Sequence, residues 1–184
     1  MERLLKIAQE GVFAADDLLL CFDRDGELVT WKKHLASFGV RSCEGIVLEI
    51  VFVSFLRKGC SGFKPIFPHS VVAIYGLRFT EGCQFAKDLE FWCYLFRVGL
   101  KLRILLEPLY FLRLTPHSLT AKANMLRNFS HYLGVFDRLL AQQGFSVEEK
   151  RLLEHYCRKA EKKRYYLLLC ISLKSTVSVK RFVI

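Results

Sequence analysis

The spacing of apolar residues along the chain changes near residue 120. Before that point, short apolar runs alternate with turn signals and short helical patterns, which is typical of a protein that mixes strands and helices. Ala14–Phe22 is a continuous apolar run apart from two Asp, and it predicts a buried strand. Glu27–Thr30 predicts a return strand, because Asp23-Arg24-Asp25-Gly26 between them ends in the Asp-Gly pair of a tight hairpin turn.

Several further elements are predicted before residue 120. Asp88–Val98 is the clearest helix, since its apolar residues share one face and Gly99 follows it. Lys101–Leu106 and Leu109–Leu114 predict two strands, separated by a break at Glu107-Pro108. The remaining patterns are shorter: helices are predicted at Glu2–Gln9, Trp31–Phe38 and Val71–Tyr75, and Ile46–Leu56 is an apolar run that fits either a strand or a helix.

After residue 120 the pattern is helical. Apolar residues from Met125 to Leu140 follow helical spacing closely. Ser146 and Glu149 then form a capping-box pattern, which begins another helix with Lys and Arg on its polar face. The chain is therefore predicted as an α/β region followed by a helical extension.

Composition and charge restrict the function. The chain has 184 residues, of which 52% are apolar, so it can bury a core and is not a disordered protein. The net charge is +10, but residues 150–184 hold ten Lys or Arg and only two Glu. A nucleic-acid role is not expected, because no recognition motif accompanies this charge.

The chain also carries signals about its compartment. Asp16 and Asp17 interrupt Gly11–Phe22, so this run is no signal-peptide core. Tyr165–Leu173 holds nine uncharged residues, whereas a spanning helix needs about 20. The seven Cys are odd in number and show no Cys-x-x-Cys spacing, which favours reduced thiols in the cytoplasm. The basic terminal helix is either a solvated face or a contact with an anionic membrane surface.

A series of motifs between Lys64 and Thr120 resembles a known enzyme family. The motifs are Lys64–Phe67, Tyr75–Phe79, Phe85–Trp92, Glu107–Tyr110 and Arg113–Thr120. In this order and at this spacing they resemble the second half of the catalytic domain of inverting, family-2 glycosyltransferases, which have the GT-A fold. Met1–Thr30 also looks like the helix and strand that follow the donor-binding centre of such enzymes.

The resemblance implies an architecture and a reaction. Residues 1–120 would form a partial GT-A-like mixed sheet with flanking helices, the acceptor side of the enzyme, and residues 121–184 a helical basic extension. The family moves a sugar from a nucleotide-sugar donor to an acceptor, here a glycan or a lipid-linked molecule. The βα units that bind the nucleotide, about a hundred residues, would precede Met1. The chain alone is therefore expected to be a truncated form with weak or no activity.

The resemblance also assigns site residues. Asp88 matches the second member of the family's acidic pair and would be the base that deprotonates the acceptor hydroxyl. Lys87 stands where the family usually has Glu, and a Lys there can pair with Asp88. Arg113, His117 and Ser118 match a closing loop near the donor diphosphate. From the residues alone, Asp88 could instead cap its helix, and Arg113 and His117 could simply face solvent.

No metal-ligand set is predicted in this chain. Asp23-Arg24-Asp25 has the letters of the family's Asp-x-Asp motif, but the turn interpretation is favoured. Mg²⁺ or Mn²⁺ would therefore bind only if a donor-binding half completed the site.

A non-catalytic module is the alternative to the enzyme. The apolar surfaces of Ile46–Phe55 and of the helix over 125–140 would then recruit a partner chain or a second copy.

Overall fold

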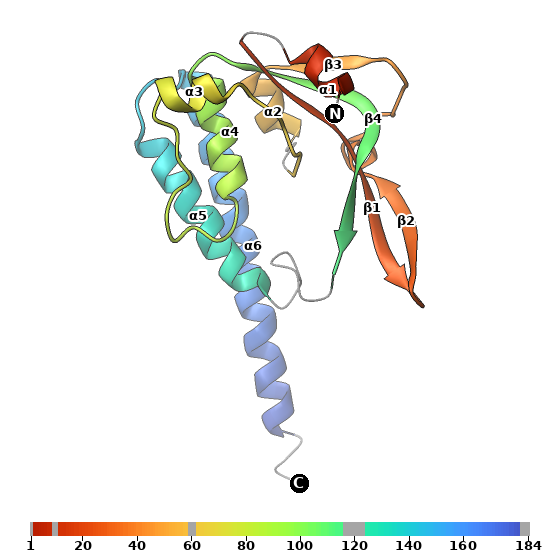
Figure 1. The fold of residues 1–184 in the computed structure, drawn as a ribbon. Coiled ribbons are helices and arrows are strands. Elements are labelled where there is room, and N and C mark those ends of the chain that lie inside the picture. The colour runs from red at the N-terminus through yellow and green to blue at the C-terminus, as the bar shows by residue number, and fades with distance from the viewer. Residues whose placement is uncertain (1, 9–10, 59–61, 116–123, 181–184) are drawn as a thin grey trace.

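The fold is a curled four-stranded mixed sheet with helices gathered beside it (Figure 1). The computed structural model describes residues 2–8, 11–58, 62–115 and 124–180. The strand order is β2-β1-β4-β3, in which β1 (Val12–Arg24) and β4 (Lys101–Leu114) are parallel. β2 (Glu27–Lys33) pairs antiparallel with β1, and β3 (Val47–Ile50) pairs antiparallel with β4. The predicted α/β class is confirmed.

The predicted hairpin between β1 and β2 is also confirmed. Arg24 lies opposite Glu27 in the ladder, so the loop consists of Asp25 and Gly26. Both loop residues have positive φ, 52° and 85°. These are the dihedral signs of the tight turn that matches strand twist, and the Asp-Gly pair adopts them readily.

β4 is a single strand, so the prediction of two strands separated at Glu107-Pro108 is wrong. The chain instead absorbs these residues in an irregularity, where the register between β1 and β4 shifts on both sides of Asp17. Pro108 lies opposite Asp17 within this irregularity. A bulge is where a strand tolerates the missing N–H of proline, so pairing resumes on the far side.

The predicted helix over Trp31–Phe38 is wrong in its first half. β2 continues to Lys33, and only Leu35–Phe38 forms a short 3-10 helix, η1. The ambiguous run Ile46–Leu56 resolves into β3 followed by α2 (Phe52–Lys58). Two other short helices lie close to their predicted positions, α1 (Glu2–Ile7) and α3 (His69–Ile74).

Three longer helices complete the fold, namely α4 (Lys87–Arg97), α5 (Met125–Ala141) and α6 (Val147–Lys180). The capping box at the start of α6 is present. The Ser146 N–H donates to Glu149 Oε2 over 2.7 Å, and the Glu149 N–H donates to Ser146 Oγ over 3.3 Å. The α5–α6 pair packs on the earlier part of the chain, where the Tyr156 hydroxyl donates to the carbonyl of Arg57 over 2.9 Å.

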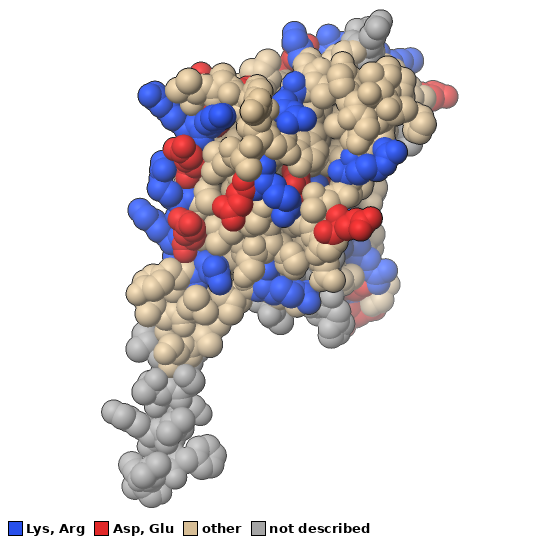
Figure 2. Space-filling view, turned by 90° about the vertical axis from the view of Figure 1, so that its left-hand side faces the viewer, with Lys and Arg blue, Asp and Glu red and all other residues tan. Residues whose placement is uncertain are grey.

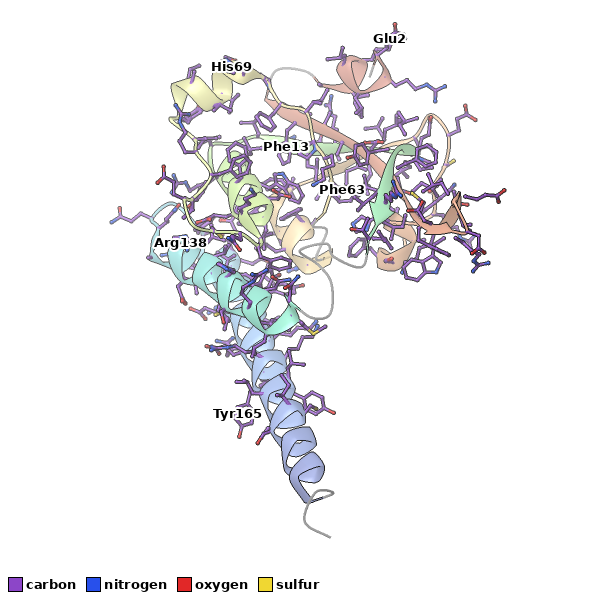
Figure 3. All side chains as sticks on the ribbon, turned by 60° about the horizontal axis from the view of Figure 1, so that its bottom comes forward. Glu2, Phe13, Phe63, His69, Arg138 and Tyr165 are labelled. Carbon is purple, nitrogen blue, oxygen red and sulfur yellow. The ribbon has the colours of Figure 1, made fainter. Side chains whose placement is uncertain are left out.

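One aromatic-rich core joins the sheet to the helices (Figure 3). Phe13 of β1 meets Phe96 of α4 edge to face, with 5.0 Å between ring centroids. Phe55 of α2 and Phe136 of α5 are each 1% exposed. The core-facing residues of Ile46–Phe55 and of the helix over 125–140 therefore pack against this chain itself. These core-facing residues are covered within the chain, because α2, α4, α5 and α6 pack on one another.

One group of exposed apolar residues lies on the distal part of α6. Ala160 is the last buried residue of α6 among those up to Ser172, whose exposure the structure describes, and it is 3% exposed. From there the helix projects away from the body (Figure 1), and Tyr165 is 65% exposed. Within the part of the chain that the structure describes, no helix is long and apolar enough to cross a membrane.

Candidate functional site

Asp88 lies in the first turn of α4. The N-cap is Ala86, which has a φ of 62°, and no side chain caps the helix. Asp88 Oδ2 lies 3.5 Å from the Lys64 ammonium, and the Asp88 side chain is 43% exposed. The capping role that the residue type allows is therefore not the one observed.

A cavity of about 410 Å³ brings Asp88 and Arg113 together. Asp88, Lys64 and Lys87 line one part of it, while Leu112 and Arg113 come from the end of β4. Two sequence-predicted site residues, from a helix start and a strand end, thus share one concave space. The cavity combines a carboxylate with three cationic side chains.

Aromatic side chains form much of the remaining wall of this cavity. Trp92 of α4 and Tyr132 of α5 both line it, and Trp92 is 4% exposed. Burial, reinforced by neighbouring Cys93 and Tyr156, raises the pKa of Tyr132 to about 12. Its hydroxyl therefore stays protonated near neutral pH and can donate a hydrogen bond. A cavity with an aromatic wall and a few polar groups has the character of a ligand site.

Arg113 is held by a partner on the neighbouring strand. Its Nε donates to Asp23 Oδ2 over 2.8 Å, and its Nη2 contacts the same oxygen. Asp23 therefore links β1 to β4 next to the hairpin turn. This role is compatible with the interpretation of Asp23-Arg24-Asp25 as part of a turn. An anion that binds Arg113 must compete with this carboxylate.

The other predicted site residues have different outcomes. His117 and Ser118 lie outside the described residues. Lys87 does not pair with Asp88, because its ammonium lies over the ring of Phe79, 5.8 Å from the centroid. The partner of Asp88 is Lys64, whose role sequence reasoning missed even though Lys64 opens the first resembling motif.

A buried ion pair joins α4 to α5. Glu90 is 1% exposed and accepts hydrogen bonds from Arg138 of α5, at 2.7 Å from Nε and 2.9 Å from Nη2. The Tyr94 hydroxyl donates to the same carboxylate over 2.9 Å. Burial raises the pKa of Glu90, but the hydrogen bonds from Arg138, Tyr94 and Thr80 outweigh it and hold this pKa below its usual value. The pair fixes α5 against α4.

The acidic pair on β1 has a structural role. Asp17 Oδ1 accepts the N–H groups of Leu18 and Leu35 over 2.8 and 2.9 Å, and Oδ2 accepts from the Ser42 hydroxyl over 2.9 Å. Asp16 Oδ2 accepts the N–H of Leu109 over 2.9 Å. Burial raises the pKa of Asp16, although these backbone hydrogen bonds oppose the shift. Both carboxylates fasten the irregular part of the sheet.

Metal ligands are not gathered anywhere in residues 2–8, 11–58, 62–115 and 124–180. No group of three or more His, Cys, Asp or Glu side chains there could hold an ion. The carboxylates that could have been metal ligands already have partners. Asp23 bonds Arg113, and Asp16 and Asp17 accept backbone N–H groups.

Comparison with known proteins gives no match. No protein-family model, curated protein or solved structure matches this chain. The function must therefore be argued from the residues and their geometry.

Proposed function

We propose that this chain carries the acceptor side of an inverting glycosyltransferase, which moves a sugar from a nucleotide-sugar donor to a glycan or lipid-linked acceptor. The observation that carries the proposal is the shared cavity of Asp88 and Arg113. Sequence resemblance assigns one residue to the acceptor and the other to the donor diphosphate. An inverting transfer needs these two functions on opposite sides of one reacting carbon, so their residues must share a cavity.

Asp88 is suited to act as the base of such a transfer. As the acceptor oxygen attacks the anomeric carbon, its proton passes to the Asp88 carboxylate and the nucleoside diphosphate departs with the bonding electrons. Asp88 is half-exposed at the cavity, so an acceptor hydroxyl can reach it. Trp92 and Tyr132 offer faces on which the sugar ring can pack.

Arg113 is suited to receive the departing diphosphate. A guanidinium binds phosphate oxygens in a bidentate manner and keeps its charge at all relevant pH values. Arg113 is 61% exposed and lines the cavity, where a diphosphate would compete with Asp23 for the guanidinium.

A metal ion would need ligands from a donor-binding part of the enzyme. Mg²⁺ and Mn²⁺ prefer several oxygen ligands, and the described residues gather no such set.

The acceptor assignment is tested by titrating the chain with alkyl glycosides and, separately, with UDP- and GDP-sugars in the presence of Mn²⁺. Saturation-transfer NMR should detect glycoside binding, whereas calorimetry should show weak or no nucleotide-sugar binding. Micromolar, metal-dependent binding of a nucleotide-sugar would overturn the restriction to the acceptor side. Failure of every glycoside to bind would overturn the proposal itself.

A non-catalytic binding module is the second candidate, favoured by exposed apolar residues at the far end of the sheet. Trp31 of β2 and Phe111 of β4 are 58% and 57% exposed. Such residues are candidates for contact with a partner chain or a second copy. Light scattering distinguishes this candidate, because a clean monomer at high concentration argues against self-association.

A further inference from the structure

A second cavity of about 350 Å³ lies beside the first, between α5 and α6. Phe85 and Tyr132 line both cavities, so the two spaces share a wall. The lining of this second cavity, the α5–α6 groove, is mostly aromatic and apolar, with two lysines from α6. It consists of Phe85, Met125, Asn128, Phe129, Tyr132, Tyr156, Lys159 and Lys163. The groove therefore runs from the neighbourhood of Asp88 toward the middle of α6.

The basic end of this groove is suited to an anion. Lys159 and Lys163 stand four residues apart on α6, so their side chains lie on the same face. Among the residues that the structure describes, neither ammonium has an acidic side chain within ion-pair distance. Lys159 lies 5.8 Å from the centre of the Tyr156 ring, which holds it at the groove. Two unpaired ammonium groups beside aromatic walls favour a phosphate group attached to a less polar ligand.

Beyond these lysines and Arg164, α6 carries the eight uncharged residues Tyr165–Ser172. They extend about 12 Å along the helix, at about 1.5 Å per residue. Five large apolar residues of this stretch are exposed, namely Tyr165, Tyr166, Leu168, Leu169 and Ile171. Figure 2 shows this stretch as an uncharged surface just above the grey tip, with Lys and Arg gathered on the body side of it.

We propose that the α5–α6 groove binds a sugar that is joined through phosphate to an apolar chain. The sugar packs on the aromatic side chains near Asp88, the phosphate lies between Lys159 and Lys163, and the apolar chain follows the exposed distal turns of α6. The order of these surfaces along the groove matches the order of the chemical groups in such a ligand. An anionic membrane carrying the ligand would meet the same basic and apolar surfaces.

The inference deepens the proposed function, since it rests on Asp88 as the acceptor base and names the acceptor class. Binding to the groove, however, can be measured without any transfer reaction. The two probes are glucose 1-phosphate, which offers sugar and phosphate, and farnesyl phosphate, which offers phosphate and an apolar chain. Farnesol serves as the probe that lacks the charge.

The test uses two double variants of the full chain with equal charge loss. Lys159→Gln with Lys163→Gln removes the groove lysines, and Arg158→Gln with Lys162→Gln removes cations from a neighbouring face of the same helix. Loss of two charge-assisted contacts should weaken both phosphate probes about tenfold or more in the groove variant. The control variant should bind like the wild-type chain. Circular dichroism checks that both variants fold.

A third variant separates the apolar chain from the phosphate. Leu168→Gln with Ile171→Gln should weaken farnesyl phosphate and leave glucose 1-phosphate unchanged. The inference is overturned if neither phosphate probe binds, if farnesol binds as tightly as farnesyl phosphate, or if the control double variant loses as much affinity as the groove variant. It is also overturned if light scattering shows a dimer that Tyr132→Ala dissociates, because a second copy would then occupy the groove.

The outcomes separate this inference from the proposed function. If glycosides bind near Asp88 but the phosphate probes do not, only the acceptor class is wrong. If the phosphate probes bind but glycosides do not compete with them, the groove stands and the glycosyltransferase proposal fails.

Discussion

Replacing Arg138 with Met tests how the helices that frame the candidate site are held. The change removes both hydrogen bonds from Arg138 to Glu90. The Glu90 carboxylate, itself 1% exposed, keeps the hydrogen bonds from Tyr94 and Thr80. Met roughly preserves the length of the side chain, so the main loss is electrostatic. The variant therefore isolates the α4–α5 contact without opening a large cavity.

The expected cost follows from the burial of the two partners. Breaking a buried ion pair on one side typically costs about 3–5 kcal/mol, because it leaves an unpaired charge. The Arg138 side chain is 38% exposed, so water can reach that end of the pair. We therefore expect a loss of about 3 kcal/mol, the lower end of that range. Glu90→Gln in the same background should recover part of the loss, since it removes the unpaired charge.

Urea unfolding followed by Trp fluorescence measures this loss, and its dependence on pH supplies an independent check. Hydrogen bonds hold the pKa of Glu90 below its usual 4.5 in the folded wild-type chain. The stabilisation from ionised Glu90 is thus present above pH 4.5 and is lost as the pH falls through the lowered folded pKa. In Arg138→Met, burial is no longer outweighed, so acid should favour the folded state of the variant.

The difference in unfolding free energy between the two proteins should therefore shrink as the pH falls, first through the raised pKa of Glu90 in the variant and then, below 4.5, through its lowered pKa in the wild-type chain. A loss smaller than about 1 kcal/mol, the range of an exposed pair, would refute the reasoning. A difference that does not change with pH would refute it as well.

Three further predictions concern the cap of α6, the core and the anion contact. Ser146→Ala should cost about 1 kcal/mol in urea unfolding, because the capping box at α6 is lost, whereas Ser130→Ala on the exposed side of α5 should change little. Phe96→Ala should cost about 3–5 kcal/mol by calorimetry, since Phe96 packs against Phe13, Phe52 and Phe55; a cost below about 1 kcal/mol would contradict this core. Asp23→Asn should strengthen pyrophosphate binding about threefold at low salt in calorimetry, because Arg113 no longer pairs with a carboxylate; unchanged binding would show that Arg113 does not receive the anion.

The parts of the fold that local sequence determines could be predicted. The β1–β2 hairpin depends on the Asp25-Gly26 pair, and the start of α6 depends on Ser146 and Glu149, so each signal lies within a few residues. The continuity of β4 could not be predicted, because Pro108 is tolerated only through the irregular pairing with β1. The end of β2 and the start of η1 are likewise fixed by Asp17, which binds the Leu35 N–H from 18 residues away.

In the candidate site, too, the residues could be predicted from the sequence but their distant contacts could not. Resemblance pointed to Asp88 and Arg113, and the structure brings them to one cavity. It could not reveal that Lys64 is the partner of Asp88, since these residues are 24 positions apart. The Glu90–Arg138 contact spans 48 positions and joins two helices whose packing no local pattern specifies.

The central claim, that the Asp88 cavity receives an acceptor sugar, is tested most directly by saturation-transfer NMR with an alkyl glycoside. The wild-type chain should transfer saturation to the sugar ring, and Asp88→Asn should weaken the glycoside about tenfold by replacing a charged acceptor with a neutral one. Asp25→Asn, an equal charge change in the hairpin turn, is the matched control and should bind like the wild-type chain. Equal binding by all three proteins, or no binding by the wild-type chain, would contradict the account.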